Sequence, residues 1–251
     1  DPSREDRRRQ SLHQGSAPSA RPRVRLSPLR ICFAIPSLDL GGAERVAAGL
    51  CNAWSGLGHS VDVVTFADAA SPPRYELRPE ISLHCVAGGG EGRSLASAAQ
   101  RLLARVRGLR RHFRQSRPDV VVSFLLEMSV PAILAARSAR IPIVVSERNH
   151  PLLNKAGRAR DLVRDWTYPR ARALVVQSGE VGESYRAHLR IDAVTVPNPV
   201  DLAAFHPAIA RRFEAGSGTI AAIGRLDPQK GHDVLIEAFA AIAPLHPGWR
   251  L

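Results

Sequence analysis

The chain has 251 residues and 45% of them are hydrophobic, so it can bury a sizeable core as one large domain or as two. Its net charge of +12 would suit a nucleic-acid binder, but residues 1–30 carry +5 and residues 93–117 carry +8, which leaves the rest nearly neutral. The longest apolar run, residues 120–136, is interrupted by Glu127 and Pro131 and is too short to span a membrane.

Three cysteines, Cys32, Cys51 and Cys85, lie far apart, with no Cys-x-x-Cys pair and no histidine spacing typical of zinc. They predict buried thiols of a reducing compartment. The N-terminus is rich in arginine but lacks the apolar core of a secretory signal, so we expect a cytoplasmic protein. Because Met128 is the only methionine and residues 249–251 resemble the opening of a further strand, we also expect a fragment.

The first predicted segments are an arm, a strand and a helix. Residues 1–28, rich in Arg, Ser, Pro and Gln, predict a disordered basic arm. Leu29–Ile35 predicts the first strand, and its run Ile31–Ile35 is apolar on both faces, as in a parallel strand covered by helices. The adjacent Gly41 and Gly42 then precede an amphipathic helix that Gly58 closes. The two glycines allow a ligand to approach the backbone, and a tight strand-to-helix turn explains them equally well.

Strands and helices alternate through the next part of the chain. Apolar runs predict strands at 61–66, 81–86, 119–124, 141–145, 173–177 and 193–196, and helical periodicity predicts helices at 94–115, 130–139, 160–168 and after the capping residue Ser178. This order predicts an α/β fold, a Rossmann-like doubly wound parallel sheet.

The helix at 94–115 carries most of the second basic segment, with arginines around an apolar stripe. A basic amphipathic helix can lie on an anionic membrane surface. A helix that covers a sheet in an arginine-rich protein has the same pattern. Both interpretations stay open at this point.

A polar cluster follows the predicted strand at 141–145. It contains Glu147, Arg148 and Asn149, an acid, a cation and an amide at a strand's carboxyl end, where doubly wound folds gather ligand groups. A solvated loop is the competing interpretation.

The end of the chain predicts a crossing to a second domain. Residues 201–218 break the periodicity, and residues 219–251 then predict strand, loop and helix. The loop carries Gly224, Arg225 and Lys230, and a helix N-terminus beside two cations favours an anion. Only two of the 35 basic residues are lysines, so a lysine here suits a point contact to phosphate. A surface turn with solvated cations is the alternative.

These motifs together resemble the GT-B family of retaining glycosyltransferases that use nucleotide-sugar donors. The resemblance covers residues 30–251 and rests on four motifs in order: Gly41-Gly42-Ala-Glu44-Arg45, Ser146-Glu147-Arg148-Asn149, Pro197-Asn-Pro-Val-Asp201, and Gly224-Arg225-Leu226 through Lys230-Gly231. The second motif resembles that of bacterial members that build polysaccharides and glycolipids.

The resemblance implies two Rossmann-like domains that face a cleft and a hexosyltransferase activity without a metal or other cofactor. Residues 29–200 would be the acceptor-binding domain, residues 201–218 the linker, and residues 219–251 the truncated start of the nucleotide-sugar-binding domain. Arg225, Lys230 and Gly224 would bind the donor diphosphate and stabilise the leaving group.

For the other positions, the resemblance implies contacts near the transferred sugar. Gly41, Gly42 and Glu44 would form the loop beneath the donor and the acceptor, and Glu147, Arg148 and Asn149 would contact the acceptor or the sugar. Many relatives have histidine where this chain has Arg148, and the family's pair of acidic residues would lie beyond Leu251, so the resemblance identifies no catalytic residue.

We expect the partners to be a nucleotide-sugar, a glycan or lipid-linked acceptor, and an anionic membrane surface at residues 94–115, peripherally on the inner face of the membrane. Two other functions compete with sugar transfer: a catalytically inactive acceptor- or membrane-binding domain, and a nucleic-acid binder. The last is disfavoured because only 5% of the residues are aromatic and no recognition motif is present.

Overall fold

The computed structural model describes residues 27–66, 72–86, 94–150, 157–200 and 218–251. The chain divides into two compact units, Asp1–Pro199 and Val200–Leu251. Nearly all of the predicted basic arm and of the predicted linker at 201–218 lies outside the described residues.

The first unit is built on one parallel sheet. Its strands are β1 (Arg30–Ala34), β2 (Ser60–Thr65), β3 (Ser82–Cys85), β4 (Val120–Phe124), β5 (Ile143–Ser146), β6 (Ala173–Val176) and β7 (Val194–Thr195). They lie in the order β3-β2-β1-β4-β5-β6-β7, and every neighbouring pair is parallel. The strand order therefore reverses between β1 and β4, which confirms the predicted doubly wound Rossmann-like sheet.

Helices alternate with the strands in the first unit. They are α2 (Gly42–Gly56), α3 (Leu95–Ser116), α4 (Leu126–Ala139), α5 (Arg158–Thr167) and α6 (Gly179–Leu189). Ser94 caps α3 through a bond from the Ser97 amide, and Ser178, as predicted, caps α6 through a bond from the Val181 amide.

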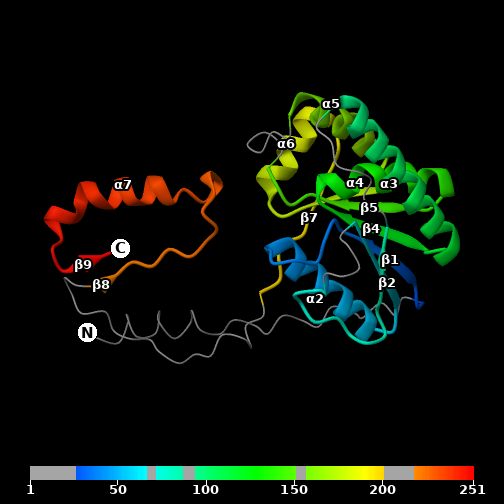
Figure 1. Cartoon of the computed structure of the whole chain (residues 1–251), viewed down its shortest axis with the longest axis horizontal. Helices are drawn as coiled ribbons and strands as arrows, with labels where there is room; N and C mark the ends of the chain where they lie inside the picture. The colour runs from blue at the N-terminus through cyan, green and yellow to red at the C-terminus, as the bar shows by residue number, and fades with distance from the viewer. Residues whose placement is uncertain (1–26, 67–71, 87–93, 151–156, 201–217) are drawn as a thin grey trace, which may run out of the picture. The chain divides into compact units, whose positions relative to one another are not determined.

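The two faces of the sheet bury two separate apolar clusters. On β1, Ile31 and Phe33 belong to the cluster that contains residues of α2, whereas Cys32 and Ala34 belong to the cluster that contains residues of α3, α4 and α6. This alternation follows the two-residue period of a strand. Figure 1 shows α2 on one side of the sheet and α3 and α4 on the other. The arginine-rich helix α3 thus covers the sheet, with Leu109 and Phe113 fully buried.

Two predictions for the first unit were wrong. Helix α4 begins at Leu126 rather than at Val130 and continues through Pro131, so the proline, which cannot donate to the Glu127 carbonyl, does not stop the helix. Cys85 is exposed rather than buried. It lies on β3, which is an edge strand whose residues are all exposed.

The second unit has two short parallel strands, β8 (Gly218–Thr219) and β9 (Trp249–Arg250), and the helix α7 (His232–Ile242). The strand predicted from Thr219 is shorter than its apolar run, because β8 pairs with β9 only through two residues. No residue of α7 is buried. Its apolar side lines a hollow of about 440 Å³ that includes Leu235, Ile236 and Phe239.

Within the described ranges, no helix has the length and apolar character that a membrane crossing requires.

Two helical glycines test the packing of this fold. A Cβ added at Gly108 of α3 would lie 2.2 Å from Cγ1 of Val86, whereas one added at Gly49 of α2 would meet nothing within 4 Å. We expect Gly108→Ala to lower the free energy of unfolding by about 1–3 kcal/mol through overpacking. Gly49→Ala should raise it by about 0.5–1 kcal/mol, because alanine favours the helix. Urea unfolding of both variants measures this, and changes of the same sign would contradict the described α3 packing.

Candidate functional site

The loop after β1 lies at the position where the strand order reverses. It ends at Gly41, whose carbonyl accepts bonds from the Tyr75 hydroxyl at 3.0 Å and the Arg45 amide at 3.1 Å. A Cβ at Gly41 would lie 2.0 Å from Oε2 of Glu44, whereas one at Gly42 would meet nothing within 4 Å. The end of the Glu44 side chain thus occupies the space beside Gly41, and its carboxylate, in the first turn of α2, complements the helix dipole there.

The carboxylate of Glu147 is buried at the end of β5, with 5% of the residue exposed. Its Oε1 accepts bonds from the backbone amides of Arg148 at 2.9 Å and Asn149 at 3.2 Å. Its Oε2 accepts bonds from the hydroxyls of Tyr168 at 2.9 Å and Tyr185 at 3.3 Å. Glu147 thus anchors the loop that the sequence predicted to bind sugar.

Both tyrosines act as donors to this carboxylate. Burial, and then the charge of Glu147, raise the pKa of Tyr168 well above its usual value, and the same two causes raise the pKa of Tyr185. The hydroxyls therefore keep their protons at neutral pH, which the acceptor-only carboxylate requires. Neither tyrosine was predicted to belong to the site, because they lie far from Glu147 in the sequence.

Arg148 connects three strand ends. Its guanidinium lies over the ring of Phe124, 4.0 Å from the centroid, and its Nη1 donates to Oδ1 of Asn198. The same oxygen accepts a bond of 3.3 Å from Nε2 of Gln177. Asn198 belongs to the predicted crossing motif, so the structure brings two of the quoted motifs into contact.

The guanidinium of Arg148 is partly desolvated. Burial lowers the pKa of Arg148 to about 10, and the charge of Glu147 acts in the opposite direction. The group remains charged at neutral pH. Its Nε is buried and has no hydrogen-bond partner within the described part of the chain. A buried donor of this kind calls for a water or a bound group.

A cavity of about 620 Å³ adjoins this loop between α3, α4 and α5. Its apolar wall includes Leu102, Leu126, Pro131 and Val163, and its polar wall includes Arg101, Arg105, Glu127, Glu147, Asn149, His150, Arg160 and Arg164. Two of these arginines are engaged in ion pairs: Arg105 with Glu127 at 2.8 Å, and the buried Arg164 with Asp161 at 3.0 Å and Asp165 at 2.9 Å. The cavity thus has one apolar wall and one polar wall, which suits a ligand with both apolar and polar parts.

One residue beside the cavity has an unusual backbone. Leu125, which lines it and precedes α4, has φ 67° and ψ 142°. Positive φ is a rare conformation for a bulky residue, and such positions cluster at functional sites. It follows β4, at the same reversal of strand order as the Gly41 loop.

In the second unit, the predicted anion loop precedes α7. Arg225 and Lys230 are exposed, and the Lys230 amide donates to the Asp227 carbonyl at 2.8 Å. A Cβ at Gly224 would lie 3.1 Å from Nε2 of His232 and 3.5 Å from Cγ of Lys230. His232, which sequence analysis did not single out, has a buried Nε2 without a partner in the described ranges. Gly224, Lys230 and His232 thus lie together at the start of α7.

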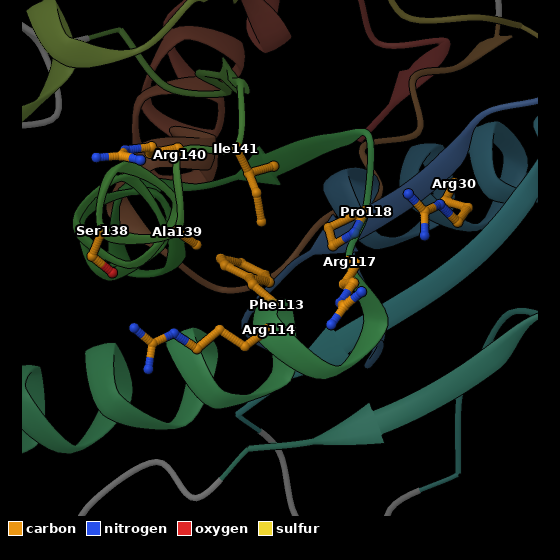
Figure 2. A pocket seen from close by; sticks show the side chains of 9 residues that line it. All are labelled: Arg30, Phe113, Arg114, Arg117, Pro118, Ser138, Ala139, Arg140 and Ile141. Atoms are coloured by element: carbon orange, nitrogen blue, oxygen red, sulfur yellow. The ribbon is translucent and has the colours of Figure 1, made fainter.

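A second hollow of about 710 Å³ lies at the amino ends of the strands (Figure 2). Its rim carries Arg30, Arg114, Arg117 and Arg140, and Phe113 lies between them. In doubly wound folds, ligands bind at the carboxyl ends of the strands. We therefore assign this hollow no part in the candidate site.

Comparison with known proteins gives a family match over most of the first unit. Residues 40–204, more than half of the chain, match the Glycosyltransferase Family 4 domain. The matched segment contains the Gly41 loop, the Glu147 loop and Asn198.

Two curated relatives are each 28% identical to the chain. One is the D-inositol 3-phosphate glycosyltransferase of Nocardiopsis dassonvillei, in a match that covers 84% of this chain and 55% of the relative. The other is the GalNAc-α-(1→4)-GalNAc-α-(1→3)-diNAcBac-PP-undecaprenol α-1,4-N-acetyl-D-galactosaminyltransferase of Campylobacter jejuni. This match covers 84% of this chain and 57% of the relative. The chain thus spans little more than half the length of these relatives.

Solved structures share the fold at low identity. Sucrose-phosphate synthase from Thermosynechococcus elongatus aligns with a TM-score of 0.65 and 16% identity over 85% of this chain and 60% of that one. Anabaena Alr3699/HepE in complex with UDP and glucose aligns with a TM-score of 0.60 and 18% identity. The alignment covers 85% of this chain and 58% of that one.

The anchoring role of Glu147 gives a prediction for stability. Glu147→Ala leaves two tyrosine hydroxyls and two amides without their acceptor, and we expect a loss of about 3 kcal/mol in the free energy of unfolding. Glu147→Gln keeps one oxygen acceptor and should lose about half as much. The control Glu183→Ala, on the exposed side of α6, should stay within about 0.5 kcal/mol of the wild type. Urea unfolding measures the free energy of unfolding of each variant. Equal stability of Glu147→Ala and the control would refute the anchoring role of Glu147.

Proposed function

The chain belongs to glycosyltransferase family 4, and we propose on that basis that it serves a retaining transfer of a sugar from a nucleotide-sugar donor to a polysaccharide or lipid-linked acceptor. The observation that carries this proposal is the convergence of the Gly41 loop, the strained Leu125 and the Glu147 loop at the carboxyl edge of the sheet. This edge is where open α/β sheets bind ligands.

The donor diphosphate is assigned to the loop before α7. Arg225 and Lys230 supply two exposed cations, and the free amides at the N-terminus of α7 favour an anion. Gly224 keeps the backbone open beside Lys230 and His232. Positive charge at this position stabilises the nucleoside diphosphate as it leaves, without a metal ion. The solved complexes of Anabaena Alr3699/HepE with UDP and with UDP-glucose are of this fold and support a donor of this class.

The acceptor is assigned to the cavity beside the Glu147 loop. A cavity of about 620 Å³ with a leucine-rich wall and an arginine-rich wall suits an amphipathic, phosphate-bearing acceptor such as a lipid-linked sugar. The relative from Campylobacter jejuni is named for a PP-undecaprenol acceptor, which is of this class. The cavity wall includes Asn149 and His150 from the same loop, and these side chains offer polar contacts for a sugar.

A peripheral position on the inner face of the membrane is part of the same proposal. The apolar stripe of α3 packs in the core of the first unit, since Leu109 and Phe113 are fully buried. Contact of α3 with anionic lipids therefore rests on its exposed arginines, among them Arg107, Arg110 and Arg111. Such contact is electrostatic and weakens with salt.

The donor assignment predicts loss of activity without loss of fold. In the gene product, Arg225→Ala and Lys230→Ala should each lower sugar transfer about a hundredfold or more, or ~3 kcal/mol of transition-state stabilisation. Arg172→Ala, which removes an exposed arginine next to the amino end of β6, is the matched control and should transfer normally. Release of nucleoside diphosphate from nucleotide-sugars measures the rate. Full turnover by both variants would refute these roles.

The membrane assignment predicts salt-sensitive binding to vesicles. Flotation with anionic vesicles at low salt should be about a hundredfold weaker when Arg107, Arg110 and Arg111 are all changed to Gln, at ~1 kcal/mol per charge. A variant with Arg137, Arg172 and Arg190 changed to Gln loses the same charge elsewhere on the first unit and should float like the wild type. Equal loss in both variants would mean that net charge, not α3, governs binding. Vesicle binding by a gene product without sugar transfer would favour the inactive acceptor- or membrane-binding domain instead.

A further inference from the structure

Three side chains of the kinds that can bind a metal meet inside the first unit, away from the candidate site. Cys32 and Asp62 are register partners on the neighbouring strands β1 and β2, and His112 reaches them from α3. Their ligand atoms, one sulfur, one oxygen and one nitrogen, all lie within 4.8 Å of one another. Cys32 is fully buried, and the side chains of Asp62 and His112 are only 17% and 11% exposed.

The cluster is held in place by its own contacts. Nε2 of His112 lies 2.6 Å from Oδ2 of Asp62. The ring of His84, from β3, lies against the ring of His112 with a centroid distance of 4.7 Å. The side chains therefore converge before any ligand is bound, which lowers the ordering cost of binding one.

The donor set selects the kind of metal. Sulfur, imidazole nitrogen and carboxylate oxygen together suit Zn²⁺, whereas Mg²⁺ and Ca²⁺ prefer oxygen alone. Zinc bonds of about 2.0–2.3 Å place two ligand atoms about 3.3–3.8 Å apart in a tetrahedron. The three ligand atoms lie within 4.8 Å of one another, and Nε2 of His112 and Oδ2 of Asp62, now 2.6 Å apart, would move apart to admit the metal.

We propose that Cys32, Asp62 and His112 form a zinc site that ties β1, β2 and α3 together. On binding, the Cys32 thiol releases its proton to solvent, and the thiolate and the Asp62 carboxylate neutralise the two charges of Zn²⁺ while neutral His112 binds through Nε2. Three protein ligands leave the fourth position to a water molecule. The site is separate from sugar transfer, because it does not include the carboxyl ends of the strands.

A hydrogen-bonded cluster without metal is the competing explanation. Burial, followed by the charge of Asp62, raises the pKa of the Cys32 thiol well above its usual value, so that the thiol stays protonated when no cation is near. A protonated thiol and an imidazole can then both bond to Asp62. This explanation predicts no affinity for zinc and so can be separated from the proposal by titration.

The first experiment titrates the metal-free 251-residue chain with Co²⁺ as a spectroscopic substitute for zinc. We expect one equivalent to bind with a thiolate-to-cobalt charge-transfer band, Zn²⁺ to displace it, and Zn²⁺ to raise Tm. Absence of the band, with Tm unchanged by Zn²⁺, would overturn the proposal.

Variants then locate the site. Cys32→Ser should abolish the charge-transfer band, and His112→Gln should weaken Co²⁺ binding by at least about tenfold. Cys51→Ser and Cys85→Ser remove a buried and an exposed thiol and should keep the band. Circular dichroism checks the fold of each variant. A band that survives Cys32→Ser but is lost in Cys85→Ser would place the metal at the exposed cysteine and refute the proposal.

Discussion

The parallel pairing of β1 with both β2 and β4 is the constraint on which the first unit depends. Because β1 has a strand partner along each edge and an apolar cluster on each face, its residues 31–34 are all buried. The chain must then leave β1 in one direction and return on its other side. That reversal spreads the loops after β1 and β4 apart and opens the edge at which the candidate site forms.

The candidate site relies on contacts that hold its loop in place before any ligand binds. Glu147 points inward to two tyrosines, and its second oxygen holds the backbone of Arg148 and Asn149. A buried carboxylate is costly unless every oxygen has a donor, and here each oxygen has two. The loop is thereby fixed in one conformation, which leaves the guanidinium of Arg148 stacked on Phe124 and directed to Asn198.

The sequence allowed the sheet to be predicted because its buried strands are short apolar runs whose flanking glycines and polar residues mark the ends. The prediction from sequence failed where strand pairing or a single residue overrides the apolar pattern. The run after Thr219 is apolar but has a partner for only two residues, and Pro131 is tolerated within α4. Sequence motifs located the loops that contain Gly41, Glu147 and Lys230. No local pattern connects Glu147 with Tyr185, or Cys32 with His112, because only the folded chain brings such distant residues together.

Gly41 has a consequence for how this loop varies among related proteins. The backbone does not demand a glycine, since φ is 178°, but the terminal carboxylate of Glu44 lies in the space that a Cβ would occupy. The two positions are therefore linked through one side chain: a larger residue at 41 requires the end of the Glu44 side chain to move, and a short residue at 44 leaves that space open. Across a family alignment they should change as a pair, while Gly42, with open space around its Cα, should vary independently of either.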